Sequence, residues 1–243
     1  MKINYTDEQT EAMKRLYGQF VKRRDLVFNV GANIGTRTQV FVDLGARVIA
    51  VEPQPEMAEA LRDRYRHQTV LMSRDSQYEH HMQQVQVIEA AAGPENGIVD
   101  LHLCTDNQLA TCEPGWAESL ADRWRMESWR NRITVQQVTL DHLVMRYGLP
   151  EFIKIDVEGY ENEVLRGLSY RVPVLCFEAT IPFVEPALAC LVQLYVRLGF
   201  TEFNYLVQET MALVLEEWVS APRMIEILRG LPESMFYVDV FAR

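Results

Sequence analysis

The sequence predicts an α/β fold with a mostly parallel sheet covered by helices on both faces, and two stretches carry that prediction. In the first, an apolar, strand-favouring run at 26–30 leads directly into the glycine loop 31–35 (GANIG), a helical pattern, and a second apolar strand at 47–51. In the second, a strand at 151–157 is followed by a glycine turn and another helix. Strands alternating with helices are typical of parallel sheets.

The chain begins with a predicted helix at 8–20, because one helical face collects the apolar residues Ala12, Met13, Leu16, Tyr17 and Phe20. Helix 36–44 has apolar residues at helical spacing and ends before a glycine, and helix 55–65 begins with a proline, which is favoured in a first turn. Residues 67–84 are polar and weakly patterned, so we expect a solvated loop that includes His80 and His81.

A third strand is predicted at 85–91, and the alternation at 98–103 predicts a fourth, antiparallel strand. Residues 105–132 interrupt the α/β pattern and hold three of the four tryptophans. Within them, a single helical stripe is formed by Trp116, Leu120 and Trp124. Strand 133–140 and the short helix 141–147 follow.

The C-terminal third continues the alternation. After the strand at 151–157 we expect helix 160–166, strand 173–177 ending at Glu178, and an apolar helix at 187–198. The rest is predicted to form a hairpin of 200–207 with 211–215, a helix at 222–228 and a final strand at 235–241. No repeat or linker divides the chain, so residues 1–243 are expected to form a single domain.

Composition excludes several classes of function. The chain has 243 residues, is 48% hydrophobic, and carries a net charge of −10, which argues against nucleic acid as a partner because phosphate binding needs clustered Lys and Arg. No apolar run of about 18 residues predicts a membrane span, and the start has no apolar core typical of a signal peptide. No C-x-x-C pair is formed by Cys104, Cys112, Cys176 and Cys190, which predicts reduced thiols and a cytoplasmic location.

The glycine loop predicts a nucleoside-containing ligand. Its glycines allow close approach of the backbone, the following helix presents free N–H groups, and Glu52 at the end of the next strand can accept the hydroxyls of a ribose. The loop reads G-x-N-x-G, so it lacks the middle glycine that admits a pyrophosphate in dinucleotide sites. S-adenosylmethionine, which has no phosphate, therefore fits better than a nicotinamide cofactor. The alternative is a purely structural glycine turn.

The strand 151–157 is the second chemically informative stretch. Alternation places Lys154, Asp156 and, if the strand extends so far, Glu158 on one face, where Lys154 can partly neutralise the two acids. Charges in a buried parallel strand are costly unless they are paired or functional. The acids also lie at the carboxyl end of the strand, where open α/β sheets bind ligands. The alternative is a structural ion-pair stripe.

Taken together, the chain resembles the FkbM-type family of S-adenosylmethionine-dependent methyltransferases. The resemblance covers about 150 residues and is carried by VFNVGANIGTRT (27–38), VIAVEPQP (48–55), IEAAAG (88–93), VTLDHL (138–143), FIKIDVEGYENEVLRG (152–167) and LCFEAT (175–180). Asn29 stands where the family usually has Asp, which removes a charge near the methionine end of the cofactor. The resemblance implies a class I methyltransferase, Rossmann-like sheet that is mostly parallel with one antiparallel final strand. It also implies methylation of hydroxyl oxygens on sugars and secondary metabolites.

The resemblance also implies the site. The expected cofactor-binding residues are Asn29, Gly31, Ala32, Asn33, Gly35, Thr36, Glu52, Pro53, Ala90 and Asp156. The expected catalytic residues are Asp156, Glu158, Lys154 and Glu178, with Asp156 the first choice as the base that helps to deprotonate the acceptor. A divalent cation such as Mg²⁺ shared by Asp156 and Glu178 is possible but not favoured, since the acids have a sufficient reason without it.

The acceptor is expected to be a small molecule, such as a sugar, glycoside or polyketide-like compound. The tryptophan-bearing segment 105–132 is well placed to close over it, although Trp116 and Trp124 could instead anchor a surface helix. Two other functions stay open at this point. One is a non-catalytic cofactor-binding subunit that regulates a partner, which Asn29 favours slightly, and the other is a nicotinamide-dependent oxidoreductase.

Overall fold

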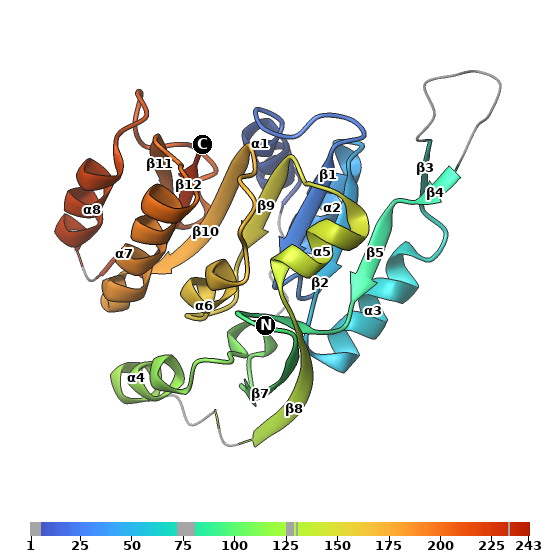
Figure 1. Cartoon of the computed structure of the whole chain (residues 1–243), viewed down its shortest axis with the longest axis horizontal. Helices are drawn as coiled ribbons and strands as arrows, with labels where there is room; N and C mark the ends of the chain where they lie inside the picture. The colour runs from blue at the N-terminus through green and yellow to red at the C-terminus, as the bar shows by residue number, and fades with distance from the viewer. Residues whose placement is uncertain (1–5, 72–80, 125–128, 130, 233) are drawn as a thin grey trace.

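The computed structural model describes residues 6–71, 81–124, 129, 131–232 and 234–243. Its centre is a seven-stranded sheet in the order β11-β12-β10-β9-β1-β2-β5 (Figure 1). The strands are β1 (Leu26–Val30), β2 (Arg47–Val51), β5 (Val85–Ile88), β9 (Phe152–Ile155), β10 (Val174–Thr180), β11 (Phe203–Val207) and β12 (Tyr237–Ala242). All neighbours pair in parallel except β12, which is antiparallel to β10 and β11, so the prediction of an antiparallel final strand is confirmed.

Helices cover both faces of this sheet, as predicted. One face packs against α1 (Asp7–Tyr17), α2 (Thr36–Asp43) and α3 (Pro55–Tyr65). The other packs against α5 (Leu140–Tyr147), α6 (Glu161–Arg166), α7 (Val184–Val192) with its π-helical extension Gln193–Arg197, and α8 (Ala221–Gly230). Within the described residues, no helix combines the length and apolarity needed to cross a membrane.

Local chemistry explains where several helices begin. The Thr6 side chain accepts a hydrogen bond from the Gln9 backbone N–H, and the Gln9 side-chain oxygen accepts one from the Thr6 backbone N–H, so α1 starts with a capping box. Pro55 occupies the first turn of α3, as its sequence position predicts. Thr139 caps α5 by accepting from the backbone N–H of His142.

A smaller, three-stranded sheet lies beyond the carboxyl ends of the parallel strands (Figure 1). It contains β6 (Ala91–Ala92), β8 (Asn131–Val138) and β7 (Gly97–Leu103), with β7 and β8 antiparallel. Between β7 and β8 the chain forms a 3₁₀ turn, η1 (Asn107–Leu109), and helix α4 (Pro114–Trp124). The segment that interrupted the α/β pattern therefore lies at the ligand-binding edge of the main sheet.

Three sequence predictions are wrong in the outer strands. The strand predicted at 85–91 breaks after Ile88, and Ala91–Ala92 joins the smaller sheet instead. The loop predicted at 67–84 contains a hairpin of β3 (Thr69–Leu71) with β4 (His81–Gln83), so His81 lies in a strand, while His80 is outside the described residues. The predicted hairpin of 200–207 with 211–215 does not form as a pair of strands, because residues 211–215 form no strand. After η4 (Gln208–Thr210) the chain returns along the open edge of β11, where the Val214 N–H donates to the Tyr205 carbonyl at 2.8 Å and Val219 forms an isolated bridge with Phe203.

Two further corrections affect the predicted site. The strand predicted at 151–157 ends at Ile155, because Glu158 has a left-handed φ of +56° that an extended strand does not allow. The strand predicted to end at Phe177 continues to Thr180, because its residues 175–180 pair with β12. Glu178 therefore lies inside β10 rather than after it.

Candidate active site

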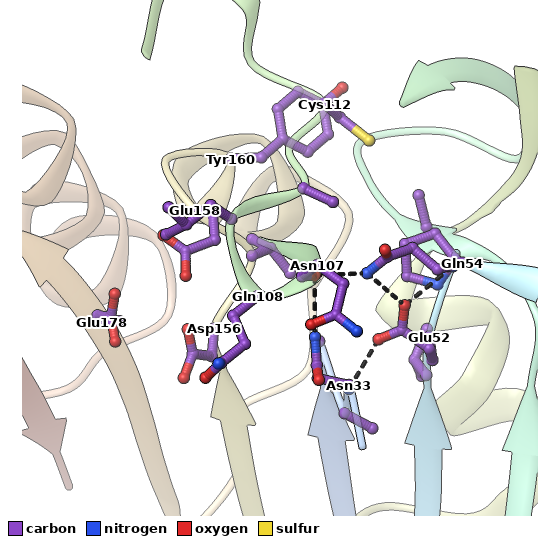
Figure 2. A pocket seen from close by; sticks show the side chains of 18 of the residues that line it. Asn33, Glu52, Gln54, Asn107, Gln108, Cys112, Asp156, Glu158, Tyr160 and Glu178 are labelled. Atoms are coloured by element: carbon purple, nitrogen blue, oxygen red, sulfur yellow. Dashed lines mark hydrogen bonds between the residues drawn. The ribbon is translucent and has the colours of Figure 1, made fainter. Parts of the chain in front are cut away.

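A cavity of about 740 Å³ lies at the carboxyl ends of β1, β2, β9 and β10, under the smaller sheet. Figure 2 shows the side chains around it, with Glu52 and Asn33 on one side and the acids on the other. Its walls include most of the predicted cofactor-binding residues, namely Gly31, Ala32, Asn33, Thr36, Glu52, Pro53, Ala90 and Asp156. The parallel strands thus bring the two informative stretches of sequence to one cavity, as the fold rule predicts.

Gly31 is required where the glycine loop meets the end of β9. Its φ is +80°, and a Cβ added there would lie 1.7 Å from the carbonyl oxygen of Asp156. Any other residue would therefore separate β1 from β9 at the cavity floor. The neighbouring backbone is held in place by the N–H groups of Gly31 and Ala32, which donate to the Val51 carbonyl at 2.9 and 3.0 Å.

Glu52 ties two loops of the cavity together. Its side chain accepts hydrogen bonds from the backbone N–H groups of Asn33 at 2.7 Å and Gln54 at 2.9 Å, and a weaker one from the Gln54 amide at 3.3 Å. Burial raises the pKa of Glu52, and these N–H donors oppose the rise. A carboxylate has about four lone-pair positions, so capacity remains for a hydroxyl group of a ligand.

The 3₁₀ turn η1 crosses over these loops. The Asn107 carbonyl accepts from the Asn33 side-chain amide at 3.0 Å and from the Gln54 side-chain amide at 2.8 Å (Figure 2). Asp106, Asn107 and Gln108 also line the cavity. Gln54 and Asn107 were not predicted as site residues. Their hydrogen bond joins positions more than 50 residues apart, so no local sequence pattern indicates it.

Three carboxylates meet on the other side of the cavity. Single oxygen atoms of Asp156, Glu158 and Glu178 all lie within 4.8 Å of one another. They arrive by different routes: Asp156 directly follows β9, Glu158 lies in the next turn, and Glu178 lies inside the neighbouring strand β10. Burial raises the pKa of Glu158 and Glu178 well above the ordinary value, and the charge of Asp156 adds to the rise. These two side chains therefore hold protons more tightly than ordinary carboxyls.

Lys154 is fully buried and does not line the cavity. Its Nζ lies 2.8 Å from Asp239 Oδ1 and 3.3 Å from Asp156 Oδ2. The predicted pairing with Asp156 is thus present, but its second acidic partner is Asp239 rather than Glu158. Burial opposes the charge on Lys154, yet the two carboxylates outweigh it and raise the pKa of the ammonium well above its usual value. One signal for Asp239 was available, since it is the single charged residue in the apolar strand YVDVFA.

Two predicted cofactor residues do not line the cavity. Asn29 is 1% exposed, and its amide donates to the Thr38 hydroxyl at 2.9 Å, so it serves the contact between β1 and α2. Gly35 faces α3, where an added Cβ would lie 2.6 Å from Leu61. Its φ of +86° ends the loop before α2. The structure therefore places both residues behind the cavity wall.

An aromatic wall faces the acids. Trp116 is 6% exposed, and its indole N–H donates to the Thr180 hydroxyl at 3.2 Å. Its ring packs on Gly159 and meets Trp129 edge-on, with ring centroids 6.0 Å apart. The side chains of Leu120 and Trp124 lie outside the described set, although both residues belong to α4 as the predicted stripe requires. Phe236 and Tyr237 complete this wall.

Residues 29–216 match the family described as the methyltransferase FkbM domain, which is more than half of the chain. No curated protein sequence matches. Similar solved structures include a putative O-methyltransferase from Klebsiella pneumoniae (8% identity, TM-score 0.48, covering 100% of this chain and 82% of that one). They also include Aeropyrum pernix fibrillarin with bound S-adenosyl-L-methionine (12%, 0.45, 96% and 74%) and precorrin-6y C5,15-methyltransferase from Geobacter metallireducens GS-15 (12%, 0.41, 99% and 89%).

The sheet order, the antiparallel β12 and the helices on both faces form the class I methyltransferase fold that the resemblance implied. The glycine loop, Glu52 and the carboxylates meet in one cavity of that fold. With the family match over residues 29–216, the chain belongs to the FkbM family of S-adenosylmethionine-dependent methyltransferases.

Proposed function

We propose that the protein transfers the methyl group of S-adenosylmethionine to a hydroxyl oxygen of a small molecule, in particular a sugar or a secondary metabolite. The observation that carries this proposal is the meeting of three carboxylates, Asp156, Glu158 and Glu178, with the glycine loop in one cavity. An alcohol is a weak nucleophile at neutral pH, so its methylation benefits from a group that accepts its proton.

The cavity fits the cofactor. The glycine loop lines the cavity, the N-terminus of α2 follows it directly, and Glu52 has remaining hydrogen-bonding capacity for a ribose hydroxyl. The small side chains of residues 90–92 keep the opposite wall open. S-adenosylmethionine would supply the electrophilic methyl group, and side chains of the protein would position the acceptor and accept its proton.

Asp156 is the proposed base. Its Oδ2 lies 3.3 Å from the Lys154 ammonium, and this contact holds the carboxylate in place at the cavity wall. Glu158 and Glu178 have raised pKa values, so they suit donating or sharing a hydrogen bond with the acceptor rather than carrying full charge. In this arrangement the acceptor O–H loses its proton to Asp156 as the new C–O bond forms and the bond from carbon to sulfur breaks.

The segment 105–132 is proposed to cap the acceptor. Trp116 presents a flat ring at the cavity wall near the acids, which suits the apolar face of a sugar or polyketide ring. The acidic lining disfavours polyphosphate acceptors such as nucleic acids. The free state of Cys104, Cys112, Cys176 and Cys190 supports a cytoplasmic location as part of the same proposal.

The two alternative functions, a nicotinamide-dependent oxidoreductase and a non-catalytic cofactor-binding subunit, have less support than methyl transfer. The family excludes a nicotinamide-dependent oxidoreductase. The non-catalytic reading relied on Asn29, yet the Asn29 side chain is bound to Thr38 away from the cavity, so its departure from the family pattern does not alter the cavity wall. Catalysis is therefore the better-supported reading.

The test is a screen of hydroxylated acceptors with S-adenosylmethionine labelled in its methyl group, followed by identification of the labelled atom. We expect a methyl ether, and a loss of about 100-fold or more in kcat for Asp156→Asn with unchanged cofactor affinity. Activity that persists in excess chelator would exclude an essential cation between Asp156 and Glu178. Label on nitrogen or carbon, or no transfer to any acceptor, would refute the proposed O-methylation.

A further inference from the structure

We propose that Asp239 is a positioning residue that acts on the reaction through Lys154. The inference rests on the proposed role of Asp156 as the base. Lys154 Nζ makes three polar contacts: Asp239 Oδ1 at 2.8 Å, Asp156 Oδ2 at 3.3 Å and the Ile155 carbonyl at 3.4 Å. An ammonium group has three protons, so these contacts occupy its donor capacity and fix its place beneath Asp156.

Strand register explains why Asp239 reaches this position. Asp239 is the direct partner of Glu178 across the antiparallel pair β10–β12, and Lys154 is the partner of Cys176 across the parallel pair β9–β10. Cys176 and Glu178 are two residues apart in β10, so their side chains share a face of the sheet. Lys154 and Asp239 therefore lie on that same face, with Asp239 level with Glu178 and Lys154 one step below it.

Asp239 has no direct route to the acceptor. It is 2% exposed, it does not line the cavity, and its ion pair with Lys154 is the shorter of the two that Lys154 makes. Its charge also contributes to the raised pKa of the neighbouring Glu178, but its direct contact toward the proposed base is the ion pair with Lys154. This separates it from Asp156, whose side chain is 28% exposed and faces the cavity.

The surroundings make the charge of Asp239 necessary. Helix α1 seals the pair from solvent with Tyr17, which is fully buried and packs edge-on against Phe152. Tyr17 and Cys176 also lie close to Lys154, and burial raises the pKa of both, which favours their neutral forms. Glu158 and Glu178 interact with Lys154 as well, but burial raises their pKa values well above the ordinary value. Without Asp239, Asp156 would be the one carboxylate left in an ion pair with the ammonium.

Asp239 and Asp156 therefore have different roles toward Lys154. Asp239 and Asp156 share the compensation of the buried Lys154 charge, so Asp156 does not carry it alone and contacts Lys154 through one oxygen, Oδ2. When Asp239 is replaced by neutral asparagine, Lys154 binds Asp156 more tightly, because a buried ammonium needs a carboxylate partner and Asp156 is the one left in contact. Asp156 is then less free to turn toward the acceptor.

The first test is a double-mutant cycle on steady-state kinetics. We expect Asp239→Asn to lower kcat by about tenfold or more, while the acceptor KM and the cofactor Kd change by less than about twofold. In a Lys154→Met background the same substitution should cause no further loss, because the two residues act as a unit. The matched control is Asp100→Asn, which removes a strand aspartate paired with exposed Arg132 and should leave kcat unchanged.

The second test needs no acceptor. The chain has four lysines, so labelling their side chains with ¹⁵N gives a simple ammonium spectrum in which Lys154→Met assigns the buried group. We expect the Lys154 signal to shift in Asp239→Asn and in Asp156→Asn but not in Asp100→Asn. If Asp239→Asn does not fold, Asp239→Glu keeps the charge, moves it by one methylene, and is measured in the same two ways.

Three results would overturn the inference. The first is a kcat of folded Asp239→Asn equal to that of the parent, and the second is an additive loss of kcat when Asp239→Asn is combined with Lys154→Met. The third is a Lys154 ammonium signal that does not shift in Asp239→Asn. A parent protein that methylates no hydroxyl would instead refute the proposed function. The ammonium spectrum still tests the further inference in that case. A Lys154 signal that shifts in Asp239→Asn but not in Asp156→Asn would show that Lys154 does not link Asp239 to Asp156.

Discussion

Truncation of Trp116 to alanine separates two roles that its position combines. The side chain is 6% exposed, so its removal should lower the free energy of unfolding by about 3–5 kcal/mol, as large buried aromatic truncations do. The ring also packs on Gly159, where an added Cβ would lie 2.4 Å from the indole Cγ. It therefore supports the turn that carries Glu158.

The kinetic effect follows from that support. A shift of about 1 Å in a catalytic group costs on the order of 100-fold in rate, so we expect kcat/KM for the acceptor to fall between about tenfold and 100-fold in Trp116→Ala. The cofactor Kd should stay near that of the parent, because Glu52 and the glycine loop lie on the other side of the cavity (Figure 2). Trp116→Phe keeps most of the apolar contact and loses the hydrogen bond to Thr180, which is worth about 1 kcal/mol.

The assay combines urea unfolding, acceptor kinetics and cofactor titration, with Trp218→Ala as the matched control. Trp218 packs edge-on against Phe20 and beneath the Arg243 guanidinium, 4.2 Å from the ring centroid, and it does not line the cavity. Its truncation should cost stability without changing acceptor kinetics. Should both tryptophan variants lose the same stability and keep the same acceptor kcat/KM, Trp116 would be an anchor only, and the proposed cap would lose its support.

Three further changes test other parts of the site. Glu52→Ala should weaken S-adenosylmethionine binding by about 1.5–3 kcal/mol in titration calorimetry, and unchanged affinity would remove Glu52 from the ribose role. Lys154→Met should lower the free energy of unfolding by about 3–5 kcal/mol, because it leaves Asp239 buried without a counterion, and a parental melting temperature would contradict this. Burial raises the pKa of Glu161 from 4.5 to about 7, so the folded state binds more protons than the unfolded state in this interval, and stability should fall as pH rises through it. Glu161→Gln should flatten that slope in urea unfolding series at about pH 5 and pH 8, and an equal slope in both proteins would count against it.

The sequence by itself determined the parts of this protein that depend on short stretches. The run from 26 to 52 predicts a strand, a glycine loop, a helix, a second strand and a terminal acid, and each of these elements is present. Asp156 was expected beside the glycine loop because parallel strands end at one edge, and β9 indeed pairs with β1. These inferences succeed because periodicity and turn chemistry are local properties of the chain.

Only the tertiary structure decided the partners of the charged residues. Lys154 and Asp239 are 85 positions apart, and their contact depends on the register of β9, β10 and β12. Glu158 reaches the other acids through a left-handed turn rather than along a strand face. Asn29, expected at the cofactor, is turned to Thr38 on α2. Which strands become neighbours, and in which register, is settled by packing across the whole sheet, so no short stretch of sequence contains that information.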